Sequence, residues 1–488
     1  MRIGTNRRVN LRGRYRCALS FLALGLLSAC GGGGSSTTPA VNRPPIFSSA
    51  TTASIVENST ALAYQATATD PDGDALTYSI VGGADAGRFT ITPAGQLGIA
   101  TAPNFDLPAD TDGNNVYEVQ ISVSDGKVAA SLAVAVTVIN SKEGISVRRV
   151  ATGFVSPAAI ARIDDTAMLV AEKTGAVYLL NPQTGTKAPL VQIANVGGVG
   201  VTAIAASRTF ASDGTFFAMY ATATGFLVVN RYLRDPLGQT VPDGSGPILA
   251  VNAPQYEGGG WLGFDAAGAL LAATGDAGGS GDPTGSAQDD TSRLGKVIRI
   301  TPNPDPFAGA SPIYFLLNTI AKGLHQPNGG SQFGNAVLIT DHGQAMAEEI
   351  DFLPFGGSVQ NYGWPFNEGT FAVRGTPPVA VIDPVVQYLR GAGPRSGQEI
   401  VGGAIGPSAV ASLRNQYVFA DGSGAIFTLA SVSIQQGTTL AGAMFERRDA
   451  DFAPDQGVID HPVAITGSPT GSMYILDADG EIFRVDAG

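Results

Sequence analysis

Between Asn42 and Asn140, apolar and polar residues alternate in short runs such as Leu76–Ile80 and Val116–Val123. Asp-Gly and Pro turns separate these runs. Alternation with a period of two turns one face of each segment toward a core, which predicts β-strands. About 100 residues of short strands and turns are typical of one β-sandwich. We therefore expect residues 42–140 to form a sandwich domain.

A different unit recurs from residue 145 onward: an apolar strand, a small polar turn with glycine, and a second apolar strand. The six units are Met168–Leu180, Phe216–Tyr232, Leu270–Ile300 with a long insertion, Ala336–Leu353, Tyr417–Leu429 and Met473–Val485. Self-similar hairpins predict a β-propeller, because one hairpin cannot bury both of its faces alone. We expect an all-β chain in which residues 145–488 form six blades. Ile145–Ala151 is an additional strand that could complete the last blade and close the ring.

The first 29 residues follow the pattern of an export signal. Six arginines precede an apolar run at Cys17–Leu27. This run is too short to cross a bilayer, because a spanning helix needs about 20 residues. Leu27–Cys30 (LSAC) resembles the bacterial lipobox, in which the cysteine receives diacylglycerol. We expect residues 1–29 to be a lipoprotein signal peptide, Cys30 to attach the protein to the membrane, and residues 30–41 to be a flexible tether. An ordinary secretory signal with a chance cysteine is the alternative.

Charge and cysteine content narrow the functional classes. The 29 Lys and Arg residues include six in the leader, so the rest of the chain carries 23 against 41 Asp and Glu, a net charge of −18. Such a surface repels phosphate backbones, which argues against a nucleic-acid partner. Cys17 lies in the leader and Cys30 would be modified, so the processed chain can form no disulfide. Gly31 replaces the aspartate that commonly retains lipoproteins in the inner membrane, which favours the outer membrane of the cell envelope.

Asp70, Asp72 and Asp74 place three carboxylates at alternate positions, which is one way for a chain to gather oxygen ligands around calcium. An EF-hand would need glycine and glutamate where this chain has Ala75 and Val81, so an EF-hand is excluded. A turn in which Asp and Gly only satisfy backbone groups is the simpler alternative to a metal site.

Several segments of the first domain follow one another in the order found in cadherins. They are Arg43–Phe47, Val56–Asn58, Ala68–Asp72, Ser124–Gly126 and Val136–Asn140. The domain thus resembles a cadherin repeat, an immunoglobulin-like sandwich that binds calcium at its junctions. Because one repeat is present, the resemblance implies calcium at Glu57, Asp106 and Asn140, at the junction with the propeller. Asp70 and Asp72 are also candidate metal ligands, although they have no upstream repeat to meet.

The second domain contains a series of short motifs. They are Val147–Val155 followed by Pro157, Gly200–Phe210, Gly259–Phe264 (GGWLGF), Ala273–Asp276 (ATGD), Leu294–Ile300 (LGKVIRI), Glu348–Ile350 and Asn361–Pro365 (NYGWP). In this order they resemble the soluble glucose and sorbosone dehydrogenases, which are six-bladed quinoprotein propellers. The resemblance implies pyrroloquinoline quinone (PQQ) and calcium as cofactors and a sugar as substrate.

The positions where that family places its catalytic groups have changed in this chain. The resemblance puts Glu257 at the position of the catalytic histidine, and His325 at the position of the arginine that steadies the reduced quinone. A carboxylate is a weak base at its ordinary pKa of about 4.3. A neutral histidine cannot replace a permanent guanidinium charge. Val199 also stands where the family has glutamine or glutamate.

Other expected cofactor positions remain polar. Asp276 and Arg293 are present, and His342 and Gly343 lie where the family offers backbone carbonyls to calcium. Each has a structural alternative: Asp276 could cap a turn, and Arg293 could pair with a neighbouring aspartate on the surface. His325, Glu257 and His342 could also line a funnel at the propeller axis without redox work.

Two hypotheses about function follow. In the first, an envelope-anchored propeller has lost its redox chemistry and binds a carbohydrate or a surface protein, displayed on a calcium-stiffened module. In the second, the protein is an active quinone-dependent aldose dehydrogenase, with Glu257 and His325 as its catalytic residues. The three changed polar positions favour the first hypothesis, and the intact glycine framework supports the second.

Overall fold

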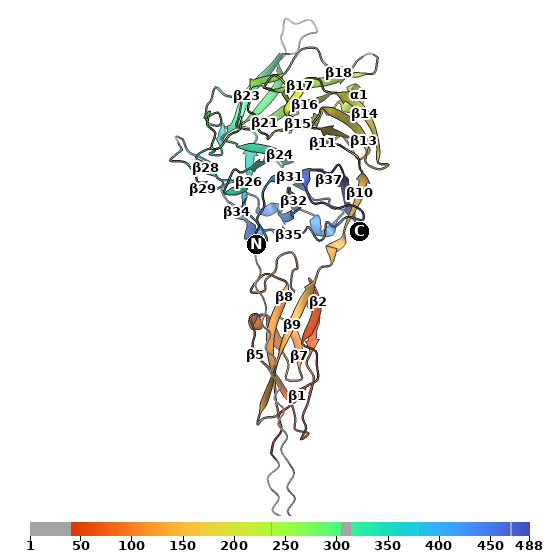
Figure 1. The fold of residues 1–488 in the computed structure, drawn as a ribbon, viewed down its shortest axis with the longest axis vertical. Helices are drawn as coiled ribbons and strands as arrows, with labels where there is room; N and C mark the ends of the chain where they lie inside the picture. Colours follow the sequence, from red (N-terminus) through yellow and green to blue (C-terminus); the bar gives the residue numbers. More distant parts are fainter. Residues whose placement is uncertain (1–40, 236, 304–313, 378, 469–470) are drawn as a thin grey trace, which may run out of the picture.

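The computed structural model describes residues 41–235, 237–303, 314–377, 379–468 and 471–488, and it contains an elongated sandwich joined to a larger propeller (Figure 1). The expected signal peptide, Cys30 and nearly all of the tether lie outside these residues. Within the described chain, no helix is both long and apolar enough to cross a membrane.

The sandwich is built from a four-stranded and a three-stranded sheet, with a small pair of strands beside them. Its strands are β1 (Ile46–Phe47), β2 (Thr52–Val56), β3 (Leu62–Gln65), β4 (Ala68–Thr69), β5 (Thr77–Gly82), β6 (Phe89–Ile91), β7 (Gln96–Ile99), β8 (Val116–Ser124) and β9 (Ala129–Ile139). The strand orders are β2-β9-β8-β5 and β3-β7-β6. Alternate residues of β8, such as Val119 and Ile121, are buried in the core, as the alternation predicts.

The propeller has six sheets of four or five strands. Its strands are β10 (Ile145–Ala151), β11 (Pro157–Arg162), β12 (Met168–Glu172), β13 (Ala176–Asn181), β14 (Thr186–Gln192), β15 (Val196–Ala206), β16 (Phe216–Thr222), β17 (Phe226–Arg234), β18 (Thr240–Pro242), β19 (Leu249–Asn252), β20 (Trp261–Phe264), β21 (Leu270–Thr274), β22 (Lys296–Asn303), β23 (Tyr314–Lys322), β24 (Gln326–Phe333), β25 (Ala336–His342), β26 (Ala347–Pro354), β27 (Gln360–Asn361), β28 (Asn367–Glu368), β29 (Phe371–Ala372), β30 (Val386–Leu389), β31 (Ile400–Ile405), β32 (Gln416–Asp421), β33 (Ile426–Ala430), β34 (Leu440–Ala441), β35 (Glu446–Arg447), β36 (Pro462–Gly467), β37 (Met473–Asp477) and β38 (Ile482–Ala487). The described helices are single turns: α1 (Phe210–Asp213) and the 3-10 turns η1 (Ala86–Arg88), η2 (Lys142–Gly144), η3 (Ala411–Leu413), η4 (Ser431–Ser433) and η5 (Gly442–Met444).

All six predicted hairpins pair as antiparallel strands in separate sheets, which confirms the propeller. The inner strands β11, β15, β20, β24, β31 and β36 contact one another around the ring, and β36 returns to β11. β10 pairs with β38 over Ile145–Ala151, so the strand that precedes the first blade completes the last one, as expected. β10 is therefore the outer strand of the last sheet, and β38 has a strand on each side.

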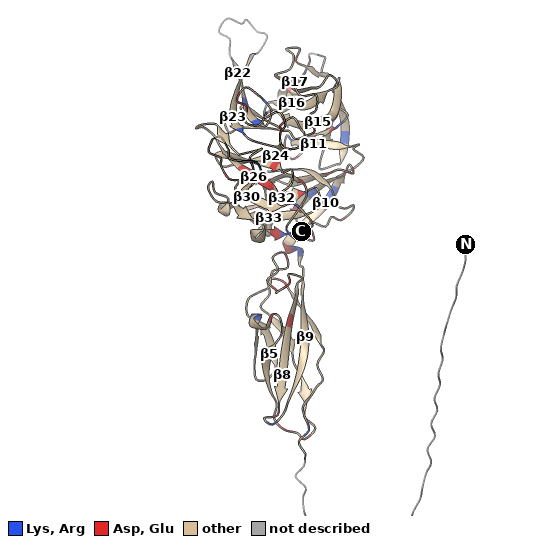
Figure 2. Ribbon diagram, turned by 60° about the vertical axis from the view of Figure 1, so that its left-hand side comes forward, with Lys and Arg blue, Asp and Glu red and all other residues tan. Residues whose placement is uncertain are grey.

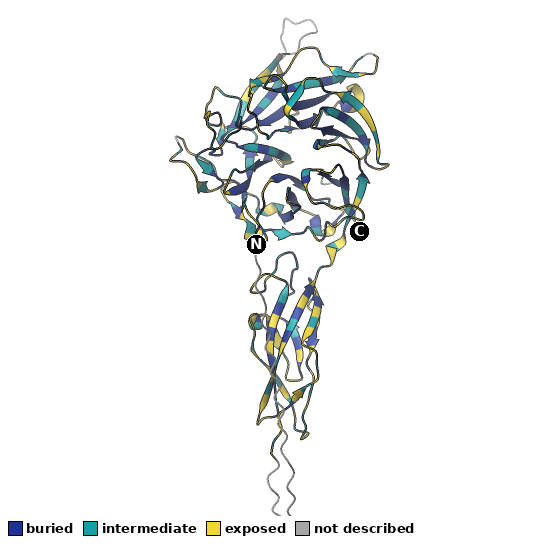
Figure 3. Ribbon diagram, in the orientation of Figure 1, coloured by how far each residue is buried: buried dark blue, intermediate teal, exposed yellow. Residues whose placement is uncertain are grey.

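The buried residues lie mainly between neighbouring blades and between the two layers of the sandwich (Figure 3). Trp261, Gly263, Gly330 and other residues of the inner strands surround a central cavity of about 220 Å³. None of the residues expected to act in catalysis or cofactor binding is among those that line this cavity. The chemistry-bearing side chains lie instead in loops at the strand ends and at the junction with the sandwich.

Candidate functional site

Four loop segments bring Asp276, His325, His342 and Trp364 together. Asp276 follows β21, His325 precedes β24, His342 ends β25 and Trp364 follows β27. The backbone joins two of these segments directly, because the Asp276 amide donates to the His325 carbonyl at 3.0 Å. The ring centres of His325 and Trp364 are 4.4 Å apart, and those of His325 and His342 are 6.2 Å apart. The structure therefore groups three of the residues predicted from sequence and adds Trp364.

Asp276 is 1% exposed and accepts two hydrogen bonds. The Trp364 indole donates to its Oδ2 at 2.6 Å, and the Gly278 amide donates to its Oδ1 at 2.9 Å. Burial raises the pKa of Asp276, although the charge of a protonated His325 and these hydrogen bonds oppose the rise. Asp276 is thus a buried carboxyl group held in one orientation, and it is more basic than an exposed aspartate.

His325 is also buried, and its amide, its carbonyl and its ring all form hydrogen bonds. Its amide donates to Asp341 Oδ2 at 2.8 Å. Its Nδ1 lies 2.5 Å from the His342 carbonyl oxygen, so Nδ1 must carry the proton and donate. Burial lowers the pKa of His325, and the nearby Asp276 only partly offsets this effect. His325 is therefore neutral near pH 7 and supplies no cation to the site.

Glu257 is exposed beside this group rather than buried in it. A Cβ added at Gly278 would lie 2.7 Å from Glu257 Cγ, and one at Gly259 would lie 2.9 Å from Gln326 Cα. Both glycines have positive φ angles, +92° and +80°. The loops can approach so closely only because these positions lack side chains. Glu257 is thereby placed over the loop that holds Asp276.

The carbonyls of His342 and Gly343, expected to serve calcium, already accept hydrogen bonds. His342 O accepts from His325 Nδ1, and Gly343 O accepts from Arg390 Nη1 at 2.9 Å. Arg390 also forms a salt bridge with the fully buried Glu348. Glu348 Oε2 lies 3.1 Å from His342 Nδ1. Burial lowers the pKa of His342, but this hydrogen bond and the charge of Glu348 outweigh burial and raise it.

Arg293 is not part of this group. Its Nη1 donates to Thr319 Oγ1 at 2.6 Å, and its Nη2 donates to the Leu317 carbonyl at 3.3 Å. The guanidinium therefore binds β23, the outer strand of its own blade. Among the described residues, it forms no salt bridge with a neighbouring aspartate. It is Lys322 that pairs with Asp290.

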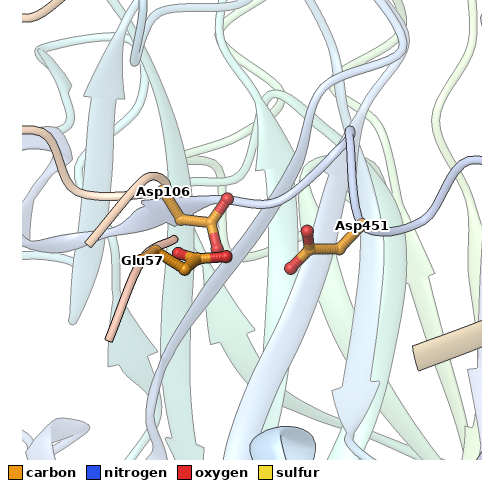
Figure 4. A group of neighbouring side chains, drawn as sticks. All are labelled: Glu57, Asp106 and Asp451. Atoms are coloured by element: carbon orange, nitrogen blue, oxygen red, sulfur yellow. The ribbon is translucent and has the colours of Figure 1, made fainter. Parts of the chain in front are cut away.

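A second candidate site lies where the sandwich meets the propeller. Glu57 and Asp106 come from the sandwich and Asp451 from the propeller, and their carboxylates point toward one another (Figure 4). One oxygen from each lies within 4.8 Å of the others, and the three residues are 3%, 2% and 0% exposed. Asp106 Oδ1 and Asp451 Oδ1 have no hydrogen-bond partner. Burial, together with Asp451, raises the pKa of Asp106 to about 8.

An arginine already lies at this junction. Arg448 is 1% exposed and donates to Asp451 Oδ2 at 2.7 and 2.9 Å, and it lies 3.4 Å from Asp106 Oδ2. It also pairs with Glu143 of the connecting segment. Acidic and basic residues thus lie together where the two domains meet (Figure 2), and Arg448 and Glu143 form a salt bridge there. Sequence reasoning missed Asp451 and Arg448, because no local motif marks them and the contacts span hundreds of residues.

The remaining predicted metal ligands are placed differently. Asp70 and Asp72 lie in the turn after β4, away from Glu57, and Asp72 forms a salt bridge with Arg43 at 2.8 Å. Asp70 Oδ1 accepts the Asp72 amide at 2.8 Å, as in an ordinary Asx turn. Asn140 Oδ1 accepts the Lys142 amide, and its Nδ2 is buried without a partner.

Comparison with known proteins identifies both domains. Residues 154–394 match the family model of glucose/sorbosone dehydrogenase, and residues 42–138 match that of a bacterial Ig domain. The chain joins a bacterial Ig domain to a glucose/sorbosone dehydrogenase domain. The sequence resemblance named the first domain a cadherin repeat, and the matching model places it among bacterial Ig domains, which fits the Ig-like sandwich.

Solved structures support the fold of the dehydrogenase domain. The PQQ-bound aldose sugar dehydrogenase of Streptomyces coelicolor is 22% identical, with a TM-score of 0.52 over 70% of this chain and 98% of that one. The apo-form of the soluble aldose sugar dehydrogenase of Escherichia coli is 19% identical, with a TM-score of 0.52 over 70% of this chain and 100% of that one. At these identities the comparison establishes a shared fold.

The residues at the Asp276 group do not fit PQQ with its calcium ion. The quinone carries three carboxylates, which need cations or hydrogen-bond donors. His325 is neutral, Arg390 is committed to Glu348, and the carbonyls of His342 and Gly343 already accept donors. An ion bound through the Gly343 carbonyl would lie beside the Arg390 guanidinium, which donates to that oxygen at 2.9 Å, and two cations so close together repel each other.

Proposed function

We propose that this protein is an envelope-anchored binding protein whose dehydrogenase-family propeller binds a neutral carbohydrate without oxidising it. One observation carries the proposal: the carbonyls of His342 and Gly343, the expected calcium ligands, accept hydrogen bonds from His325 and from the cationic Arg390. The polar groups left for a ligand are acceptors, above all the exposed Glu257 carboxylate. Carboxylates accept hydrogen bonds from sugar hydroxyls, and an acidic surface disfavours anionic ligands.

The test is titration of the purified protein with neutral oligosaccharides and, separately, with PQQ and calcium. We expect calorimetric binding of a neutral glycan that weakens at least tenfold in Glu257→Gln, and no quinone absorbance retained at micromolar PQQ. Asp479→Asn, on a surface turn of another blade, is the matched control and should bind as the wild type does. Binding of acidic glycans in preference to neutral ones would contradict the proposal.

The second candidate function is a quinone-dependent aldose dehydrogenase, and the raised pKa of Asp276 favours it. Burial raises the pKa of this carboxyl group beside His325. A carboxylate with a raised pKa is a better general base than an ordinary one. In this case the holo-protein would bleach a quinone acceptor on addition of an aldose, and Asp276→Asn would abolish the bleaching while leaving PQQ retention measurable. That result would replace the binding proposal.

Attachment to the membrane at Cys30 is part of the proposal. It is supported by the LSAC sequence at residues 27–30, and Gly31 favours the outer membrane. Cells fed a labelled fatty acid should label the wild type and not Cys30→Ser, and the variant should leave the membrane fraction. Labelling of both proteins, or release of both, would contradict the anchor.

We also propose calcium at the junction between the domains, bound by Glu57, Asp106 and Asp451 with Asn140 nearby. The support is the burial of these carboxylates and the two oxygens without partners. Three carboxylates exceed the single charge of Arg448, so a divalent cation can neutralise the remainder. Millimolar calcium should raise the melting temperature of the wild type and not that of Glu57→Gln. Asp72→Asn, at the far end of the sandwich, should respond as the wild type does.

A further inference from the structure

A separate cluster of acids lies inside the dehydrogenase domain, between two blades. Asp341 is the second-last residue of β25, and Glu349 and Asp351 lie on β26. Asp341 and Glu349 are register partners across the two strands, and Asp351 is two residues along from Glu349 on the same face. One oxygen from each carboxylate lies within 4.8 Å of the others. Leu353, next on that face, packs with Leu271 of the neighbouring blade, so the cluster faces the interior.

The cluster has more acceptors than partners. Asp341, Glu349 and Asp351 are 1%, 5% and 0% exposed. Both oxygens of Asp351 and Oε2 of Glu349 are buried with no hydrogen-bond partner. In the described part of the chain, no lysine or arginine forms a salt bridge with any of the three. This distinguishes the cluster from the domain junction, where Arg448 supplies a counter-charge.

Such an arrangement is costly without a cation. Leaving even a single charged group buried and unpaired is strongly destabilising, and here up to three carboxylates share one dry site. Burial raises the pKa of all three groups, and that of Asp341 to about 7. Protons or a metal ion must therefore supply the missing positive charge.

We propose that Asp341, Glu349 and Asp351 bind a calcium ion inside the propeller. The available donors are all oxygens, which hard cations prefer, whereas zinc prefers nitrogen and sulfur. Three oxygens that all lie within 4.8 Å of one another can surround one ion at about 2.4 Å, which is a calcium–oxygen distance. Magnesium keeps several of its waters, and a site this buried leaves no access to solvent for them.

This ion would stabilise the arrangement of Asp276, His325 and Trp364 through its ligand Asp341. Asp341 Oδ2 accepts the amide of His325, and Oδ1 accepts that of Gln326 at 2.7 Å. The ion would hold Asp341, and Asp341 in turn fixes the start of β24 on which His325 is placed. Its removal should therefore change the surroundings of Trp364, whose ring lies against His325.

Metal analysis of the purified full chain tests the proposal. After dialysis against metal-free buffer, elemental mass spectrometry should find one tightly held calcium per chain in the wild type and in Glu57→Gln, and none in Asp351→Asn. A strong chelator should lower the melting temperature of the propeller by about 5 °C, as expected when about 4 kcal/mol of linked binding is lost from a domain of about 340 residues. Tryptophan fluorescence should change in parallel.

Calcium content and melting temperature are also measured for a control variant. Asp421→Asn removes another buried carboxylate, one whose oxygens accept Tyr388 and backbone amides, and it should keep the calcium. The proposal would be overturned if the wild-type protein contains no calcium and its melting temperature does not change with the chelator. Such protein would hold its acids protonated. This result is decisive even if Asp351→Asn fails to fold. Loss of calcium in Glu57→Gln with retention in Asp351→Asn would assign the ion to the junction and also overturn it.

Discussion

Replacing Arg448 by methionine is the sharpest test of how the two domains are held together. The substitution keeps most of the side-chain volume and removes the guanidinium that is 1% exposed among Asp451, Asp106 and Glu143. Breaking a buried ion pair costs about 3–5 kcal/mol, because the remaining charge stays buried. At about 2.1 cal/mol/K per residue, a domain of about 340 residues should then melt about 4–7 °C lower.

The assay is urea unfolding of the full chain, followed by tryptophan fluorescence, in buffer with a chelator. Arg447→Met is the matched control, because Arg447 is 39% exposed and pairs with an equally exposed Asp449. Such a surface pair contributes less than about 1 kcal/mol. The double variant Arg448→Met/Asp451→Asn should regain part of the stability, since it leaves fewer unpaired charges. Calcium should also stabilise Arg448→Met more than it stabilises the wild type.

One result would refute this reasoning. If Arg448→Met is as stable as Arg447→Met in the presence of the chelator, the guanidinium is not the counter-ion of the buried carboxylates. Those carboxylates would then be protonated in the folded protein, and calcium at the junction would have no unpaired charge to bind.

Three further predictions concern the propeller. Trp364→Phe removes the donor to Asp276 Oδ2 and should cost about 1–3 kcal/mol in urea unfolding, and an unchanged midpoint would contradict the hydrogen bond. In buffer with a chelator, the protein should have a higher melting temperature at pH 5 than at pH 8.5. The folded-state pKa is about 7 for Asp341 and about 8 for Asp106, and both exceed the unfolded value of about 4. The folded protein is therefore stabilised by bound protons at low pH, and this stabilisation is lost as the pH rises through the two folded-state values. A melting temperature that rises over this range would show that the groups are ionised. Deleting Ile145–Ala151 from an isolated propeller should prevent cooperative unfolding, because β38 loses its partner, and a sharp transition in that protein would contradict the closure.

The strands could be predicted from the sequence because their signals are local. Period-two alternation and glycine turns lie within each hairpin, so the sequence predicts all six hairpins. It also shows Ile145–Ala151 as an extra strand before the first of them, which could complete the last blade and does pair there. The position of Arg293 could not be predicted in this way. Its guanidinium binds Thr319 and Leu317, and that choice depends on the packing of β23 against its own blade rather than on any motif.

The same limit applies to the acids. Glu57 and Asp106 were paired correctly as neighbours, because the resemblance to a repeat with known junctions carried three-dimensional information. Asp451 was missed, since it comes from a different domain and more than 300 residues later. Asp70 and Asp72 gave the stronger local pattern, yet they form an Asx turn beside Arg43. The local spacing of acids thus did not predict which carboxylates lie together in the fold.

The glycine motifs and the polar substitutions carry different information about function. At Gly259, Gly275 and Gly278 an added Cβ would lie within 3 Å of a neighbouring loop. These glycines are therefore required by the packing of the loops, whether or not a quinone binds, and their presence is no evidence of redox chemistry. The more informative residues are His325 and Arg390, which donate to the carbonyls of the expected calcium site and place a cation beside one of them. A propeller can keep its framework for stability while these two side chains change what it binds.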